Sequence, residues 1–547
     1  MWSEFFMELT KWNVWNTYAY YFVEPIENLY DVAQKIVQSK LAISAFHSTG
    51  IAWYWSEGNV IKRPVEIDHV GYSCDARIKL PNAENPYALE CILQSSRMRV
   101  AEMGVLNESL QDALPYVRAH LGECVIELND QQIILYPQIK IYNNGAFLVE
   151  FRTIGPEARY SLNTLIDRNI NLFTHIAENI ELPPQLVSLY AKFVLYEHYK
   201  SPIAWYKDSK EFKKYKERIE QEKYFSQVNG FEFEYVSLGY GFTIKDIFDY
   251  ICGALTVSLN DTYNYPIPVK KKKYNLGSYW SGRPSVYLVE FDEQPFNALE
   301  VHTKFKTSLN KIMSRTTFEG ITTDFLGKNF RAFDDFALYV GRALTLFVFS
   351  REAERPIRIH KLSASFRRPF KDPNMDEVYG HHQIKVELTD FAYVSYQRMM
   401  ERSTLNVKNV TEILHEKEQL LALENNLQVC SHSGELNDFF LHTWNIFGLN
   451  SIRTNIEQNF ALKIARLSEI QGLSMQRFGW VLSIIFGLSG VVELGQNFVQ
   501  PLWRQLEWPL PIGDDLLKIY STMIAAVGML VIVLAVWCIT VGRKPKV

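Results

Sequence analysis

The residues best suited to chemistry on a small anion lie in one basic segment, Arg351–Lys371, which reads REAERPIRIHKLSASFRRPFK. This segment carries seven arginine or lysine side chains against two glutamates. Arginine presents a planar fork of N–H donors that matches the oxygen atoms of a phosphate group. The composition therefore indicates phosphate recognition, although a solvated face or a contact between subunits would use the same residues. The candidate ligand-binding residues are Arg351, Arg355, Arg358, Arg367 and Arg368.

A second group of polar residues interrupts an apolar run near the C-terminus. Phe478–Trp503 begins with fifteen uncharged residues and then carries Glu493, Gln496 and Asn497. A later run, Tyr520–Gly542, has no charged residue and is long enough to cross a hydrocarbon core of about 30 Å as a helix. Polar side chains inside a membrane are costly unless they face water or protein. We therefore expect two transmembrane helices, the first with a polar end that lines a wet space.

Charge predicts the orientation of this hairpin. Basic side chains flank its outer ends, namely Lys463, Arg466, Arg477, Arg543, Lys544 and Lys546. Basic flanks remain on the cytoplasmic side of a membrane. The sequence thus predicts a multi-pass protein of the inner (cytoplasmic) membrane with both termini in the cytoplasm and the lipid bilayer as a partner.

The elements ahead of the hairpin mix two periodicities up to about residue 395. Amphipathic helical patterns occupy 163–180 and 188–201. Strand-like runs occupy 65–80, 124–130, 132–142, 147–154, 231–244, 286–291, 343–349 and 378–388. In the last of these, His381 and His382 would point to opposite faces, so they would not share a metal ion. The fold class that follows is a large cytoplasmic α/β (or α+β) domain, then long stalk helices and the C-terminal two-helix transmembrane hairpin.

Four regions follow from these patterns. We predict an N-terminal cytoplasmic α/β region at 1–205, a second α/β region at 206–395, a helical stalk at 396–477 and the hairpin with its basic tail at 478–547. In the stalk an apolar residue recurs every three or four positions from Ile452 to Leu473. A helix from Ser451 to Val499 would be about 75 Å long. Self-association of several copies would bury such a stripe, so we expect a homo-oligomer.

Composition and motifs exclude several classes of protein. The 547 residues are 47% hydrophobic with a net charge of -4, which excludes a disordered chain and a binder of nucleic acid polymers. The six cysteines are scattered, as expected for neither a disulfide framework nor a zinc site. Walker, dinucleotide, zinc-protease and hydrolase motifs are absent from the sequence. We therefore expect no enzyme, no catalytic residues and no covalent cofactor.

The C-terminal arrangement resembles the CorA family of two-span divalent-cation channels. In that family the first span ends in Gly-Met-Asn, and this chain has Leu494-Gly495-Gln496-Asn497-Phe498 at the corresponding place. The resemblance implies that Gly495, Gln496 and Asn497 form the outer pore mouth, with Asn497 holding a hydrated cation. It also implies a pentamer of this chain and Mg²⁺ as a candidate ion, although we identify no metal-ligating residues.

Helical spacing inward from this motif predicts a gate. Val492, Leu488, Ile485 and Val481 recur on one helix face, and an apolar ring of such residues can close a pore by dewetting. Either Phe478 or Arg477 follows at the inner mouth, and the spacing does not decide which.

The length of the cytoplasmic part suggests an additional input. One CorA branch accompanies type III CRISPR systems, and the resemblance implies a membrane effector opened by a nucleotide second messenger such as S-adenosylmethionine joined to AMP (SAM-AMP). Our first hypothesis is thus an antiviral channel gated by a small anionic nucleotide. A metal-regulated magnesium transporter of ordinary CorA type is the alternative, and a membrane-anchored enzyme is a third hypothesis from another class.

Overall fold

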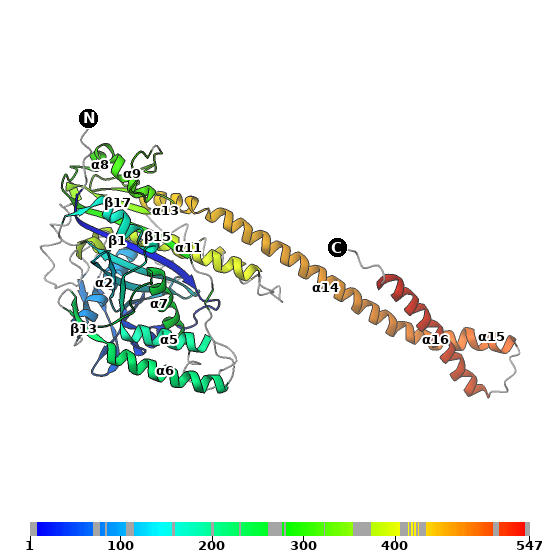
Figure 1. Cartoon of the computed structure of the whole chain (residues 1–547). Helices are drawn as coiled ribbons and strands as arrows, with labels where there is room; N and C mark the ends of the chain where they lie inside the picture. The colour runs from blue at the N-terminus through cyan, green and yellow to red at the C-terminus, as the bar shows by residue number, and fades with distance from the viewer. Residues whose placement is uncertain are drawn as a thin grey trace. The chain divides into compact units, whose positions relative to one another are not determined.

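A computed structural model gives the fold of the chain, which Figure 1 draws as a cartoon. The chain divides into a large unit, Met1–Val407 with Thr411–Asn459, and a C-terminal unit, Lys408–Val410 with Phe460–Val547. The structure describes residues 8–68, 77–82, 85–105, 114–155, 159–197, 202–228, 231–260, 276–277, 280–321, 323–353, 373–404, 414, 417–418, 421–422, 425, 434–506 and 513–541.

A mixed β-sheet forms the centre of the large unit. Its strand order is β13-β14-β12-β8-β9-β10-β1-β15-β17-β16, and β7, β2, β3 and β4 extend in turn from β9. β11 pairs with β1, and β5 and β6 form a separate ribbon. The strands are β1 Glu8–Tyr21, β2 Ala42–His47, β3 Ile51–Ser56, β4 Asn59–Pro64, β5 Glu66–Asp68, β6 Arg77–Lys79, β7 Tyr116–Leu121, β8 Cys124–Leu128, β9 Gln131–Tyr142, β10 Ala146–Ile154, β11 Tyr160–Ser161, β12 Asn179–Leu182, β13 Tyr224–Val228, β14 Phe231–Ser237, β15 Trp280–Phe291, β16 Phe336–Val340 and β17 Thr345–Phe349.

β1 lies in the middle of this sheet. It pairs antiparallel with β10 on one side and with β15 on the other. Its side chains alternate between the two faces, as the pleat of a strand requires. Val14 joins an apolar cluster on one face, whereas Trp15 joins another cluster on the opposite face. Both faces of the central strand are therefore buried.

Helices α1, α5 and α7 cover an apolar region of the sheet. Val32 of α1 and Phe248 of α7 pack in one buried cluster with Phe147 and Phe151 of β10. Apolar burial of this extent is the main favourable term for the docking of these helices. The helices of the large unit are α1 Leu29–Gln38, α2 Pro86–Val105, α4 Leu162–Thr164, α5 Pro184–Glu197, α6 Pro202–Glu222, α7 Ile244–Leu259, α8 Ala298–Lys304, α9 Lys306–Ser314, α11 Pro373–Thr404 and α13 Gly434–Ile446, with the short turns η1 Leu165–Ile170, η2 Leu172–Thr174 and η4 Arg351–Ala353.

Two local predictions are wrong. The continuous helix expected at 163–180 is instead α4, η1 and η2 followed by strand β12. The strand expected at 378–388 is part of the 32-residue helix α11. The alternating pattern misled the second prediction because α11 is buried on several sides, so apolar and polar residues alike have lost contact with water. Ile384, Lys385 and Val386 are consecutive and each at most 1% exposed.

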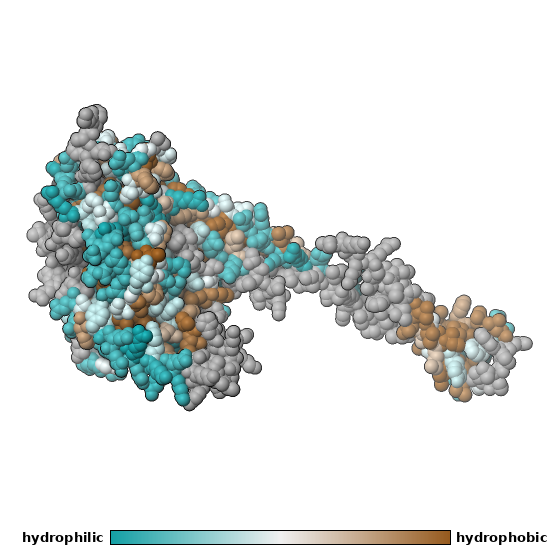
Figure 2. Space-filling view, viewed as in Figure 1, coloured by the Kyte–Doolittle hydropathy of each residue, from teal (hydrophilic) through white to brown (hydrophobic). Residues whose placement is uncertain are grey.

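The C-terminal unit is helical. It contains most of α14 Leu449–Leu494, then η5 Gly495–Val499, α15 Gln500–Gln505 and α16 Asp514–Val541. Apolar side chains gather on the surface of its described part (Figure 2), among them Val492, Leu494, Phe498, Leu502, Leu506, Leu516, Ile519, Met523, Val527 and Leu530. The stripe predicted in the stalk is covered in part within a single chain, since Ile456 and Phe460 are at most 2% exposed.

The predicted transmembrane hairpin is wrong. Over the residues that the structure describes, no helix combines the length and the apolar composition needed to cross a membrane. The prediction was based on two apolar runs of sequence. In the structure, the helices that contain these runs also carry Glu493, Asp514, Asp515 and Lys518, and charged side chains disfavour burial in hydrocarbon. The identification as a multi-pass inner-membrane protein is therefore wrong as well, because it depended on these spans.

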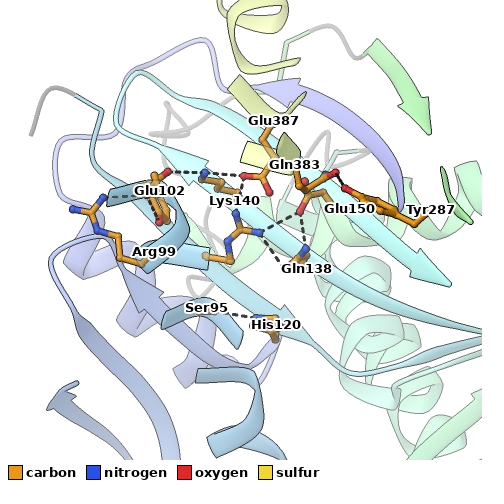
Figure 3. A network of polar contacts seen from close by, with 12 residues as sticks. Ser95, Arg99, Glu102, His120, Gln138, Lys140, Glu150, Tyr287, Gln383 and Glu387 are labelled. Atoms are coloured by element: carbon orange, nitrogen blue, oxygen red, sulfur yellow. Dashed lines mark hydrogen bonds and ion pairs between the residues drawn. The ribbon is translucent and has the colours of Figure 1, made fainter. Parts of the chain in front are cut away.

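A buried layer of charged and polar side chains lies between α11 and the sheet (Figure 3). Glu387 of α11 is at its centre, and its Oε2 atom accepts from Arg118 Nη2 at 2.7 Å and from Lys140 Nζ at 2.8 Å. Glu102 of α2 accepts from the same lysine at 3.2 Å. Glu150 of β10 accepts from Arg118 Nη1 at 3.4 Å. Glu387, Arg118, Lys140 and Glu150 are each at most 1% exposed.

Opposite charges offset the cost of burying this layer. Burial opposes the ionisation of Glu387, but Arg118 and Lys140 outweigh it and hold the pKa of Glu387 below its usual value. Burial and the neighbouring Glu387 raise the pKa of Glu150. Arg118 contacts both carboxyl groups, yet the pKa of Glu387 lies below its usual value and the pKa of Glu150 lies above it.

We expect Glu387→Gln to destabilise the large unit by about 3 kcal/mol, because it leaves Arg118 and Lys140 buried without their shared carboxylate. Urea unfolding of the full chain at pH 7, followed by tryptophan fluorescence, measures this change. Glu290→Gln is the matched control, since Glu290 meets Lys11 at 3.6 Å with a side chain that is 57% exposed, and such surface pairs contribute little. Equal unfolding midpoints for the two variants would contradict the role given to Glu387.

Candidate functional site

A pocket opens beside the neighbouring strands β1 and β15 of the sheet. Its volume is about 240 Å³. Strands β1 and β15, the β16–β17 turn and helix α11 each contribute to its wall, together with η2, the residue that follows α9 and the residue that follows α13. The lining residues are Asn16, Thr17, Tyr18, Phe173, Arg283, Pro284, Arg315, Arg342, Ala343, Tyr393 and Phe447. Three of them are arginines and four are aromatic, which is the composition of a site for an anion that carries a flat ring.

Arg283 is the buried cation of this pocket. It lies on β15 and is only 2% exposed. Its Nη1 donates to the carbonyl oxygen of Gly341 at 3.3 Å, and its guanidinium carbon lies 4.3 Å from the centre of the Phe447 ring. Its Nε and Nη2 atoms are buried without a hydrogen-bond partner among the described residues. A buried N–H group without a partner is costly, and Arg283 is one of the residues that line the pocket.

Burial also acts on the charge of Arg283. It lowers the pKa of this guanidinium to about 10, while Asp390 of α11 acts in the opposite direction. The group therefore stays cationic at neutral pH. Both carboxylate oxygens of Asp390 lack a hydrogen-bond partner among the described residues, and burial raises the pKa of this acid to about 7. At neutral pH the arginine is thus only partly neutralised by its acidic neighbour.

Arg315 forms a second, less buried wall. It ends α9 in the left-handed conformation, with φ 55°. Its Nε donates to Asn171 Oδ1 at 3.0 Å and its Nη2 donates to the carbonyl oxygen of Ile170 at 2.9 Å. The guanidinium carbon lies 4.5 Å from the centre of the Phe173 ring. Burial lowers the pKa of Arg315 to about 10. These contacts hold its charge at the pocket wall.

Two further polar groups complete the wall. Thr17 of β1 is 2% exposed, and its hydroxyl has no hydrogen-bond partner among the described residues. Arg342 lies in the turn between β16 and β17 and is exposed, so it can meet an anion at the pocket entrance. A hydroxyl and three guanidinium groups can together bind the oxygens of a phosphate, sulfate or carboxylate.

Of the predicted anion-binding residues the structure describes only Arg351, and Arg351 does not line this pocket. Arg351 lies in η4 with an exposed side chain, and its backbone N–H donates to Pro295 at 2.9 Å. The other candidates, Arg355, Arg358, Arg367 and Arg368, lie outside the described residues. The arginines that do converge are Arg283, Arg315 and Arg342. Sequence reasoning missed them because each is a single cation next to a turn signal, as in the segment WSGRP around Arg283.

The residues predicted to form a pore mouth lie in the C-terminal unit. Gly495, Gln496 and Asn497 belong to the π-helical turn η5. Gly495 is buried, and a Cβ atom added there would lie 2.8 Å from the backbone of Thr522 in α16. Gln496 and Asn497 are exposed. Glycine is thus required for close packing of η5 on α16, a role that needs no pore.

The predicted gate residues all lie on α14 and in the same unit. Val492 is 44% exposed. The side chains of Val481, Ile485 and Leu488 lie outside the described residues. Over the part of the chain that the structure describes, His, Cys, Asp and Glu side chains form no group of three that could hold a metal ion such as Mg²⁺.

Comparison with known proteins identifies no relative of this chain. No family model matches it, and neither a curated protein nor a solved structure matches. The chemistry of the pocket is therefore the basis for assigning a function.

Proposed function

We propose that the large unit is a sensor that binds a small anionic ligand, of the nucleotide class, in the Arg283 pocket. The observation that carries this proposal is the buried guanidinium of Arg283 with two N–H donors that lack partners among the described residues. A buried charge with unpaired donors is costly unless a bound acceptor offsets the cost of its desolvation. An acceptor with two oxygens, such as a phosphate, fits the fork of this side chain.

The aromatic residues of the pocket favour a ligand with a ring. Tyr393 and Phe447 have ring centres 5.9 Å apart, and both line the pocket. Phe173 is 43% exposed beside them. Flat, partly exposed rings next to cationic groups stack well on nucleobases. A phosphate joined to a nucleobase can therefore contact both the arginines and the aromatic residues of the pocket, whereas inorganic phosphate can contact only the arginines.

The size of the pocket limits the ligand. At about 240 Å³ it is smaller than the roughly 300–1,000 Å³ of typical sites for drug-sized ligands. A nucleoside monophosphate, or one such moiety of a larger messenger such as SAM-AMP, suits this volume better than a whole cyclic oligonucleotide. The pore, the magnesium transporter and the tethered enzyme are not part of the proposal, because each requires a membrane span.

Arg283→Met tests the proposal, since methionine fills a similar volume and removes the charge. We expect it to weaken the binding of AMP to the full chain about 10- to 100-fold, because charge-assisted hydrogen bonds contribute roughly 1.5–3 kcal/mol. Isothermal titration calorimetry with AMP, SAM-AMP, inorganic phosphate and adenosine provides the measurement.

Arg351→Met is the matched control and separates the structural site from the sequence-predicted one. It should leave AMP affinity unchanged, because Arg351 does not line the pocket. Unchanged affinity in Arg283→Met with a loss in Arg351→Met would contradict the proposal and restore the basic segment as the site. Absence of binding heat for every phosphate ligand would also contradict it.

The pH dependence of binding tests the role of Asp390. Its pKa is about 7, so between pH 6 and pH 8 it becomes a carboxylate that neutralises Arg283 and repels an anion. Glu387 on the same helix adds to this negative charge. Relative to Asp390→Asn, the native chain should therefore lose AMP affinity several-fold as pH rises from 6 to 8. The phosphate of AMP titrates equally in both experiments, so a constant ratio of the two affinities would exclude a role for Asp390.

A further inference from the structure

The pocket lies next to the junction between α13 and α14. Phe447 and Gly448 are the two residues between these helices, and Gly448 has φ 65°, a conformation that suits glycine. Phe447 lines the pocket, whereas Leu449 begins α14. The side chain of one junction residue is thus part of the proposed ligand site.

The N-terminal end of α13 is anchored by ion pairs. Glu435 Oε1 accepts from Arg331 Nη1 at 2.8 Å and lies 3.0 Å from His382 Nε2 of α11. Arg331 also contacts both oxygens of Asp335 at 2.8 Å. Burial opposes the ionisation of Glu435, but His382 and Arg331 outweigh it and lower its pKa to about 2. Burial lowers the pKa of His382, so at neutral pH Glu435 is held by the Arg331 cation and by a hydrogen bond from the neutral His382 ring of α11.

The C-terminal end of α13 is held by ring contacts and a hydrogen bond. Phe447 meets the guanidinium of Arg283 at 4.3 Å and the ring of Tyr393 at 5.9 Å between centres. On the far side of the junction, Asn450 of α14 accepts from the Trp444 ring nitrogen at 3.0 Å. The contact that joins the pocket to this junction is the one between Phe447 and Arg283.

Two different parts of Arg283 serve the ligand and the junction. Phe447 lies against the guanidinium group, whereas the unpartnered Nε and Nη2 atoms donate in the guanidinium plane. An anion that accepts from these donors lies in the guanidinium plane. It fixes the orientation of a side chain that is otherwise held by the 3.3 Å bond to Gly341 and by the ring itself.

We infer that an anion bound at Arg283 orders the α13–α14 junction through Phe447. This inference depends on the proposed function, since it concerns the response of that same site. By thermodynamic linkage, the ring contact that the ligand stabilises must also favour the ligand. Loss of the Phe447 ring should therefore weaken ligand binding moderately and abolish the response of the junction.

Hydrogen–deuterium exchange of the full chain with saturating AMP provides the test. In the native chain we expect amide exchange over residues 448–456 to slow at least 3-fold. Phe447→Ala should bind AMP within about 10-fold of the native affinity by calorimetry and show no such slowing. Leu441→Ala is the matched control on α13, because Leu441 is 51% exposed, and it should respond as the native chain does.

The outcomes separate this inference from the proposed function. Absence of AMP binding would overturn both. Binding of AMP without slower exchange at 448–456, or with equal slowing in Phe447→Ala, would overturn only the inference. A comparison without ligand adds a second criterion. Arg283→Met and Phe447→Ala should each speed amide exchange at the junction. Exchange in the double variant should be no faster than in either single variant. Additive effects in the double variant would show that the two residues do not act through one contact, which also overturns the inference.

Discussion

The shared carboxylate of Glu387 is the interaction on which the large unit depends. It joins Arg118 of β7 and Lys140 of β9 to α11 across a buried interface. Taking these charges out of water costs several kcal/mol each unless opposite charges meet them. α11 can therefore lie on this face of the sheet only in the register that brings Glu387 between the two cations. The same register sets the positions of Asp390 and Tyr393 further along the helix.

The pocket results from the incomplete compensation of charge at this further part of α11. Around Glu387 each cation has a carboxylate within hydrogen-bond distance. At Arg283 the nearby acid is Asp390, whose oxygens accept no hydrogen bond from a described residue. Burial raises the pKa of that acid to about 7, which leaves the arginine the more fully charged partner at neutral pH. One continuous interface thus provides both rigid support and a site with residual positive charge.

Local sequence patterns predicted those elements whose environment is local. The strand-like runs at 124–130, 132–142 and 147–154 are observed as β8, β9 and β10, and the amphipathic pattern at 188–201 lies partly in α5. Residues 378–388 of α11 were read as a strand because the partners of its buried charges are distant; Glu387 and Arg118 are 269 positions apart. The arginines of the pocket were missed because each is a single cation in its own segment, and the three come from separate parts of the sequence. The spans were predicted from two apolar runs of sequence, whereas none of the helices among the described residues combines the length and the apolar composition that a span requires.

The position of β1 has a consequence for the assembly of the fold. β10, which covers one edge of β1, ends at Ile154, whereas β15, which covers the other edge, begins at Trp280. During synthesis the chain therefore carries an open strand edge at the future centre of its sheet until about half of its length has been made. Pairings between such distant segments form slowly, and an open edge can pair with another chain. Productive folding of the large unit is thus limited by the arrival of a distant strand more than by the preference of any local segment.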